Sequence, residues 1–142
     1  MTIRPAKHYE ISVIKHYEAK VRKEASMGYL QDNVTNNDEL FAFENSFYLV
    51  SVVEGNLQGW ILLGDSFDPN FNNYTGMILE LYVFKPYRNK GIGKQLLTQA
   101  LHYFKRKGIK RAQLNVFAGN PARKLYERLG FTEISRIMEL PL

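Results

Sequence analysis

The first half of the chain combines a helix-like pattern with two strand-like runs. Apolar residues at near-helical spacing, with Lys, Arg and Glu between them, predict an amphipathic helix over residues 8–27. A polar run that can cap a helix predicts a second, short one over 36–43. Strand formers then fill 47–53 and 57–63, and the Gly-Asn pair between them indicates an antiparallel hairpin.

The next segment, residues 64–76, is rich in Asp and Asn and contains Pro69. This composition predicts the longest polar loop of the chain. The segment also carries Phe67, Phe71 and Tyr74. Long loops with aromatic side chains are often functional, so we expect this one to take part in binding.

The second half alternates strand and helix patterns. Strands are predicted over 77–84, 111–117 and 131–138, and helices bounded by glycine or proline over 91–108 and 120–130. This order makes the first two of these strands parallel neighbours joined by a right-handed crossover. Together with the hairpin of the first half it predicts a mixed sheet flanked by helices, in the α/β (α+β) class.

Composition narrows the possible functions. The 142 residues, 45% hydrophobic and 23% charged, fit one domain, residues 1–142. The net charge of +5 is compatible with nucleic acid, an anionic membrane surface or an anionic cofactor. With no Cys and only three scattered His, we expect neither thiol nor metal chemistry. No run resembles a signal peptide or a membrane span, so a cytoplasmic protein without membrane contact is expected.

The turn before the 91–108 helix has the features of a phosphate site. Gly91 and Gly93 let an anion approach the backbone at a helix start, where amide N–H groups are unpaired, and Arg88 adds positive charge. A P-loop would need a glycine where Arg88 stands and Ser or Thr in place of Gln95, and a dinucleotide site would need a glycine in place of Leu96. Both of those nucleotide sites are therefore excluded.

A second segment, residues 120–131, follows the 111–117 strand and reads Asn-Pro-Ala-Arg-Lys-Leu-Tyr-Glu-Arg-Leu-Gly-Phe. Together with the Arg-x-x-Gly-x-Gly turn at 88–93, it resembles the GCN5-related N-acetyltransferase (GNAT) family over about residues 47–138. The resemblance implies acetyl-CoA as co-substrate and a centrally splayed sheet, split between the 77–84 and 111–117 strands. It further implies that the pantetheine arm pairs with the first of these strands like an added strand.

The resemblance assigns cofactor contacts to three places. The strand before the split offers backbone groups, the glycine turn holds the pyrophosphate, and the second segment faces the cofactor from the other side. The expected cofactor-binding residues are Leu81, Tyr82, Val83, Arg88, Asn89, Lys90, Gly91, Ile92, Gly93, Lys94, Asn115, Asn120, Ala122, Lys124 and Tyr126.

Two side chains are candidates for proton transfer. Family resemblance makes Tyr126 the general acid for the departing thiolate, although its spacing also fits a core tyrosine. Glu80, on the strand beside the expected thioester, is the candidate base, because apolar neighbours would raise its pKa, and a half-exposed structural glutamate is the alternative. A water relay held by Asn115 or Glu80 is also open.

The acceptor is expected to be a primary amine of a small molecule, peptide or protein, acetylated by direct transfer in a ternary complex. Acidic and aromatic groups that could receive a cationic amine are Tyr29, Asp32, Asp38, Glu39, Phe41, Glu44, Asp65, Phe67, Asp68, Phe71 and Tyr74. A non-catalytic acyl-CoA-binding module is the alternative function. The basic run 105–111 would suggest nucleic acid, but helix C-termini favour such charges anyway, so nucleic-acid binding is disfavoured. The C-terminal strand could complete the sheet or pair with a second subunit in a homodimer.

Overall fold

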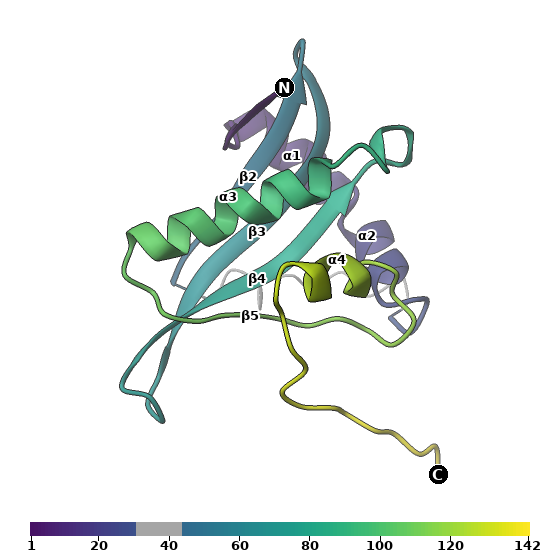
Figure 1. Ribbon diagram of the computed structural model, residues 1–142. Helices are drawn as coiled ribbons and strands as arrows, with labels where there is room; N and C mark the ends of the chain where they lie inside the picture. Colours follow the sequence, from purple (N-terminus) through teal and green to yellow (C-terminus); the bar gives the residue numbers. More distant parts are fainter. Residues whose placement is uncertain (31–43) are drawn as a thin grey trace.

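The computed structural model describes residues 1–30 and 44–142, so the short helix expected over 36–43 lies outside the described residues. Five strands form one sheet in the order β1-β2-β3-β4-β5 (Figure 1). Their bounds are Thr2–Pro5 (β1), Glu44–Val53 (β2), Asn56–Asp68 (β3), Asn73–Val83 (β4) and Ala112–Leu114 (β5). The first four strands run antiparallel to their neighbours, and β4 and β5 are parallel. The mixed sheet and the parallel pair confirm the predicted class.

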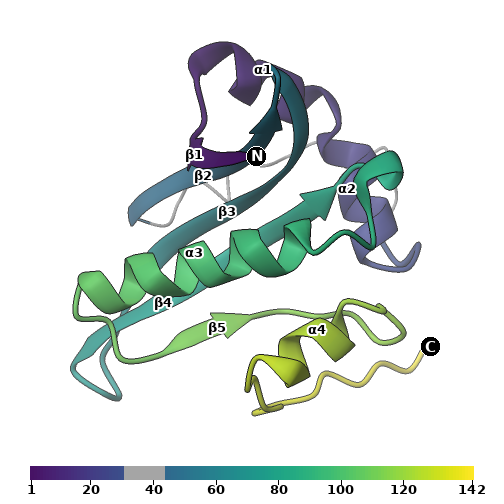
Figure 2. The ribbon, with the colours of Figure 1, turned by 45° about the horizontal axis from the view of Figure 1, so that its top comes forward.

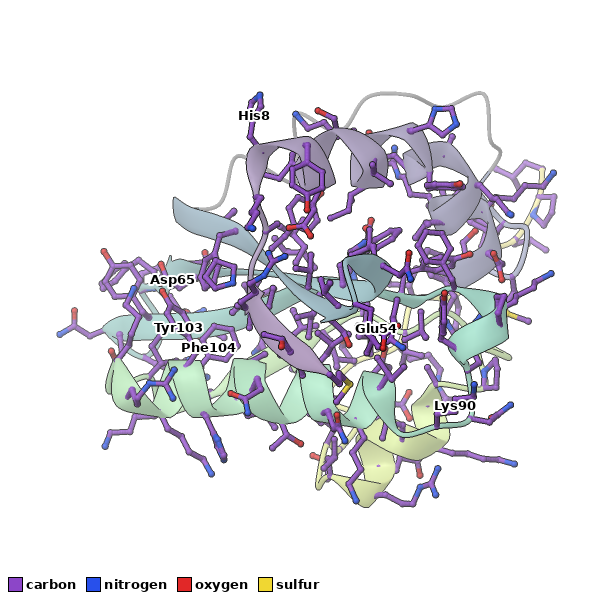
Figure 3. The ribbon with its side chains drawn as sticks, turned by 90° about the horizontal axis from the view of Figure 1, so that it is seen from above. His8, Glu54, Asp65, Lys90, Tyr103 and Phe104 are labelled. Atoms are coloured by element: carbon purple, nitrogen blue, oxygen red, sulfur yellow. The ribbon has the colours of Figure 1, made fainter. Side chains whose placement is uncertain are left out.

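Helices cover both faces of this sheet. Their bounds are His8–His16 (α1), Glu18–Ala25 (α2), Ile92–Arg106 (α3) and Arg123–Arg128 (α4), with a short 3-10 helix at Lys85–Tyr87. Seen from above, α1 and α2 lie over one face and α3 lies along the other, so the sheet is the middle of three layers (Figure 3).

Alternation along the central strands supplies a core to each face. Ile61 and Leu63 of β3 pack with Leu96, Leu97 and Phe104 of α3. Their neighbours Trp60 and Leu62 point to the other face and pack with Ile14 of α1, Val21 of α2 and Tyr82 of β4. A strand buried on both faces reads as a continuous apolar run, as 60–63 does.

The hairpin of β2 and β3 confirms the turn predicted there, because Glu54 and Gly55 adopt positive φ angles of 50° and 79° between the two strands. The polar loop expected over 64–76 is wrong. β3 continues through Asp68 and pairs with β4 from Asn73 onward, so only four residues form the connection. Two acidic side chains of this stretch, Asp65 and Asp68, form ion pairs with Lys107 and Arg111, and composition therefore misled the prediction.

Three helix and strand boundaries also differ from expectation. The helix predicted over 8–27 is interrupted at Tyr17, whose ring packs edge-on against Phe84. The strand expected over 111–117 is only Ala112–Leu114, and α4 begins at Arg123 after a turn in which Asn120 Oδ1 accepts from the Ala122 amide at 2.9 Å. Strand β1 was not anticipated.

The strand expected over 131–138 is wrong. Residues 131–142 run beyond α4 as an extended chain without helix or strand (Figure 1). Ile134 and Ile137 are 76% and 93% exposed, as isolated apolar side chains on a chain with no neighbouring strand would be.

Candidate active site

The sheet opens between β4 and β5. The two strands pair at only three positions, ending with Ile78 and Leu114, and then diverge (Figure 2). From Leu79 to Val83, β4 therefore has a strand neighbour on one side only within the described part of the chain. This confirms the split that the family resemblance implied.

The backbone of β4 presents polar groups toward the split. Phe84 N donates to Gln58 O at 3.0 Å, and the register pairs Tyr82 with Trp60, so Tyr82 and Phe84 bond to β3. In an antiparallel pair the residues between them point the other way. The N–H and C=O groups of Leu81 and Val83 thus face the split, and within residues 1–30 and 44–142 the Val83 carbonyl accepts from Arg88 Nε at 2.7 Å.

A bulge makes this arrangement possible. The β3–β4 register shifts between Leu62 and Leu63, which leaves Leu79 as an extra residue in β4. Before the bulge, Ile78 packs toward α3, and after it Leu81 and Val83 pack on that same face. Glu80 and Tyr82 are consequently directed to the face covered by α1 and α2.

The turn between β4 and α3 has the geometry of an anion site. Gly91 caps α3 with φ 81°, in the left-handed region that favours glycine, and no side chain caps the helix. The first helical bond runs from Gln95 N to Gly91 O at 3.0 Å, so the amides of residues 92–94 keep their donors free within the described residues. Lys90 and Lys94 are exposed beside them, which suits a phosphate.

Arg88 does not extend into this turn. Its Nη2 donates to Glu24 Oε1 of α2 at 3.0 Å, and its guanidinium lies 5.2 Å from the centre of the Tyr82 ring. Asn89 adopts a positive φ of 62° and is exposed. Within the turn, the glycines, amides and lysines are therefore free for a ligand, whereas Arg88 ties the turn to α2.

Glu80 lies in the α1–α2 layer and accepts a hydrogen bond from Trp60 Nε1 at 2.6 Å. The pKa of its carboxyl group is raised to about 6, and burial is the largest cause. The hydrogen bond from Trp60 and the charge of Arg22 lower this pKa, and the charge of Glu18 raises it. A carboxylate with this pKa is ionised at neutral pH and basic enough to accept a proton. Sequence reasoning singled out Glu80 as a candidate base and did not anticipate its partner Trp60, although the register of β3 and β4 places the indole diagonally across from it.

Tyr126 is 9% exposed on α4 and packs with the α3-side core and with Phe131, 6.1 Å away between ring centres. Burial raises the pKa of its phenol, which keeps the hydroxyl protonated. Within the described part of the chain this hydroxyl has no hydrogen-bond partner. Tyr126 thus packs in the core on the α3 side of the sheet, whereas Glu80 bonds to Trp60 on the other side.

The remaining residues that were expected to bind the cofactor from the β5 side differ in their exposure and in their partners. Asn115 follows β5 and is exposed, as is Lys124 on α4, while Ala122 is partly buried at the N-cap of that helix. Asn120 directs its Nδ2 to Ala25 O at 2.9 Å, toward α2. Asn120 is therefore hydrogen-bonded to α2, as Arg88 is.

Three of the residues considered for the acceptor, Asp65, Asp68 and Phe71, contact the basic run instead. Lys107 Nζ lies 3.1 Å from Asp65, Arg111 Nη2 lies 3.6 Å from Asp68, and the Arg111 guanidinium stacks 3.4 Å from the centre of the Phe71 ring. The Lys107–Asp65 pair lies at the end of α3 opposite Lys90, where Figure 3 labels Asp65. A pocket of about 250 Å³ lies there, lined by Asp65, Asn73, Tyr74, Lys107, Gly108 and Ile109, and it is not part of the split.

The other acceptor candidates give no further support for that pocket. Asp32, Asp38, Glu39 and Phe41 lie outside the described residues, as does the side chain of Glu44. Phe67 and Tyr74 pack against each other edge-on at 5.5 Å. Tyr29 is exposed and donates a hydrogen bond to Glu139 of the C-terminal segment.

Two general features of the described residues bear on the kind of protein. None of the helices in residues 1–30 and 44–142 is long and apolar enough to span a bilayer. Those same ranges contain no cluster of three or more His, Cys, Asp or Glu side chains arranged to hold a metal ion.

Comparison with known proteins identifies the family. The model of the acetyltransferase (GNAT) family matches residues 14–131, most of the chain. The chain therefore belongs to the GNAT acetyltransferase family. Among curated relatives, the "Uncharacterized N-acetyltransferase YycN" of Bacillus subtilis is 34% identical over 63% of this chain and 56% of its own length. The "Putative phosphinothricin acetyltransferase YwnH" of the same organism is 29% identical over 94% of this chain and 85% of its own.

Solved structures agree on the fold. A "Putative acetyl transferase" from Pyrococcus furiosus superimposes with a TM-score of 0.84 over 99% of both chains at 26% identity. An aminoglycoside N-acetyltransferase, AAC(6')-Iy, in complex with CoA superimposes with a TM-score of 0.68 over 99% of this chain and 93% of its own, at 18% identity. The split sheet is thus the fold shared with these acetyltransferases.

Proposed function

We propose that the chain is an acetyl-CoA-dependent N-acetyltransferase that transfers acetyl directly to a primary amine within a ternary complex. The observation that supports this most is the juxtaposition of the uncapped, glycine-led start of α3 with the unpaired edge of β4. The first offers amides and lysines to a pyrophosphate, and the second offers the Leu81 and Val83 backbone to an extended amide-containing arm.

The residues present fit that co-substrate. A pantetheine arm between β4 and β5 would replace the missing strand partner of Leu81 and Val83, and the Val83 amide is the candidate donor to the thioester carbonyl. Lys90 and Lys94 would neutralise phosphate charge. On the β5 side the exposed Asn115 and Lys124 remain available, while Ala122 borders the opening.

Bound acetyl-CoA supplies the acetyl group as a thioester, whose C–S bond breaks as a C–N bond to the amine forms. Glu80, ionised above its pKa of about 6, takes the proton released by the amine nitrogen, directly or through a water molecule. Tyr126, kept protonated by its raised pKa, gives its hydroxyl proton to the departing thiolate. Both residues hold the protonation state that their role requires at neutral pH.

The acceptor is proposed to be a primary amine reached from the α1–α2 side, where Glu80 lies. We propose a cytoplasmic location, because the proposed co-substrate, acetyl-CoA, is an intracellular metabolite. We further propose that residues 1–142 form one domain. Neither nucleic acid nor membrane is required for this activity.

The test is amine-dependent release of free thiol from acetyl-CoA, followed with a thiol-reactive dye. The chain has no Cys, so the protein gives no background signal. We expect release only when an acceptor from a panel of small amines and peptides is present. If coenzyme A raises the melting temperature and no amine on the panel supports release, the chain is a non-catalytic acyl-CoA-binding module instead.

Tyr126→Phe separates a catalytic tyrosine from a core tyrosine. Phenylalanine preserves the packing against Phe131 and removes only the hydroxyl, which has no protein partner among the described residues. We expect the melting temperature to stay unchanged and kcat to fall by about 10²–10⁴. An unchanged kcat would assign Tyr126 to the core alone.

A further inference from the structure

The end of α2 and the turn after it, residues 24–29, span the open end of the sheet. We call these residues the bridging segment. They contact the β4–α3 turn on one side of the split and the β5–α4 connection on the other. These two connections follow the carboxyl ends of parallel strands, where the opening between β4 and β5 is widest (Figure 2).

On the β4 side the contact is made by Glu24. Its Oε1 accepts from Arg88 Nη2 at 3.0 Å, and its Oε2 accepts from the Tyr82 hydroxyl at 3.4 Å. Arg88 Nε in turn donates to Val83 O at 2.7 Å. A single guanidinium therefore connects α2 to the last carbonyl of β4, at the residue where the anion-binding turn begins.

On the β5 side the contact is made by Asn120. Its amide donates through Nδ2 to Ala25 O at 2.9 Å and accepts through Oδ1 from Ala122 N at 2.9 Å. The rings of Tyr29 and Phe117 lie 6.0 Å apart next to it. One asparagine thus joins the C-terminus of α2 to the turn that precedes α4.

The two contacts act on adjacent residues of one short segment. Glu24 uses its side chain and Ala25 its backbone carbonyl, so they fix the same end of α2 from opposite sides of the split. A helix end held at both sides limits how far β4 and β5 can separate. Binding an extended arm between two strands requires a defined separation, because hydrogen bonds weaken steeply away from their preferred distance.

We propose that Glu24 and Asn120 are positioning residues that hold the bridging segment across the split and so set its width for coenzyme A. The inference rests on the proposed function. Glu24 acts through Arg88 and the turn, and Asn120 acts through Ala25, so neither needs to touch the cofactor. This role differs from direct cofactor contact, which is what the family resemblance assigned to Asn120 and Arg88.

A double-mutant cycle tests the proposal. Coenzyme A affinity is measured by isothermal titration for wild type, Glu24→Ala, Asn120→Ala and the double variant. Breaking either contact releases the same segment, so we expect each single variant to weaken binding about 5–20-fold and the double variant to be no weaker than about the larger single effect. Effects that multiply in the double variant would show that the residues act independently and would overturn the proposal.

Two further readouts separate positioning from a general loss of stability. The matched control is Glu127→Ala, which removes the exposed α4 pair with Arg123 at 2.8 Å and is expected to leave affinity unchanged. In the acetyl-transfer assay, KM for acetyl-CoA should rise in both single variants while kcat at saturation stays within about threefold, and Glu24→Gln should restore part of the affinity through its remaining hydrogen bonds. A fall in kcat with unchanged KM would contradict the proposal.

Hydrogen exchange of the cofactor-free protein isolates the bridging role from the proposed function. We expect amides of residues 24–30 to exchange faster in both single variants and at the wild-type rate in Glu127→Ala. Unchanged exchange in the single variants would overturn the inference directly. If wild type itself binds no coenzyme A, the proposed function fails, and the assignment of a cofactor-positioning role fails with it.

Discussion

At the scale of single residues, the surroundings of Glu80 and Glu10 shift the pKa values of these two glutamates in opposite directions, although both side chains are buried or partly buried. Glu10 is 2% exposed and receives two hydrogen bonds from Arg4, so its pKa is lowered. Glu80 receives one bond from a neutral indole, so burial dominates and its pKa rises to about 6. Glu10 is therefore held in its charged form, whereas Glu80 titrates closer to neutral pH.

Glu80→Gln should therefore stabilise the fold while it impairs catalysis. A folded-state pKa raised from 4.5 to about 6 means that ionised Glu80 costs stability, a cost absent below pH 4.5 and complete once the pH exceeds 6. Glutamine keeps an acceptor for Trp60 without the charge, so we expect the free energy of unfolding to rise by roughly 1–2 kcal/mol at pH 7 and to be unchanged near pH 4.5. Urea unfolding at the two pH values measures this.

In the same variant, kcat should fall by about 10²–10⁴ if Glu80 is the base. Wild-type kcat should also decline as the pH falls through about 6. A variant that is less stable than wild type at pH 7 would mean that Glu80 makes a stabilising ionic contact and is structural. Retained kcat would transfer the role of base to another group.

At the scale of helices and strands, contacts between residues far apart in the chain explain which elements could be predicted from the sequence and which could not. The α3 helix was predicted because its apolar stripe faces β3 and β4 along its whole length. The extension of β3 and β4 beyond residue 64 was missed because Asp65 and Asp68 pair with Lys107 and Arg111, some 40 residues later in the chain. Such pairs cannot be seen in a local window, and they turn a loop-like composition into a hairpin.

The Arg4–Glu10 pair joins β1 to α1 and should be important for the stability of both. Glu10 also accepts from the Lys7 amide at 2.8 Å, so its loss uncaps α1 and leaves Arg4 without its partner. We expect Glu10→Ala to lower the free energy of unfolding by about 2–3 kcal/mol at pH 7, since the pair is buried on the glutamate side only. Chemical denaturation measures the change.

The pH dependence of this effect follows from the lowered pKa of Glu10. The contribution is complete above pH 4.5 and is lost as the pH falls through the folded-state pKa, so wild type and Glu10→Ala should converge in acid. The control Glu127→Ala removes an exposed surface pair and should leave the free energy of unfolding nearly unchanged at any pH. A constant difference between wild type and Glu10→Ala from pH 7 to pH 3 would show that packing, not charge, is responsible.

At the scale of the whole molecule, the split sheet explains both the main success and the main error of the sequence prediction. The Arg88–Gly93 turn and the Asn120–Phe131 segment predicted the split because the first follows β4 and the second follows β5, the two strands that flank it. The expected strand over 131–138 failed because strand formers need a neighbouring edge. The edge strand β5 ends at Leu114, and within the described part of the chain residues 131–142 do not pair with it.

If residues 134–142 contribute little to the fold, their removal should change the melting temperature very little. Among the described residues, their side-chain bonds to the rest of the chain are those of Tyr29 to Glu139 and of Arg136 to Glu133, and they otherwise expose apolar side chains such as Ile137. We expect the truncated chain to melt within about 2 °C of the full chain in differential scanning calorimetry. Ile137→Lys, which keeps the length and removes one apolar side chain, should likewise leave the melting temperature unchanged. A loss of more than about 5 °C in both variants, growing with protein concentration, would mean that this segment pairs with a second copy in solution, as an extended apolar chain beside the edge strand β5 permits.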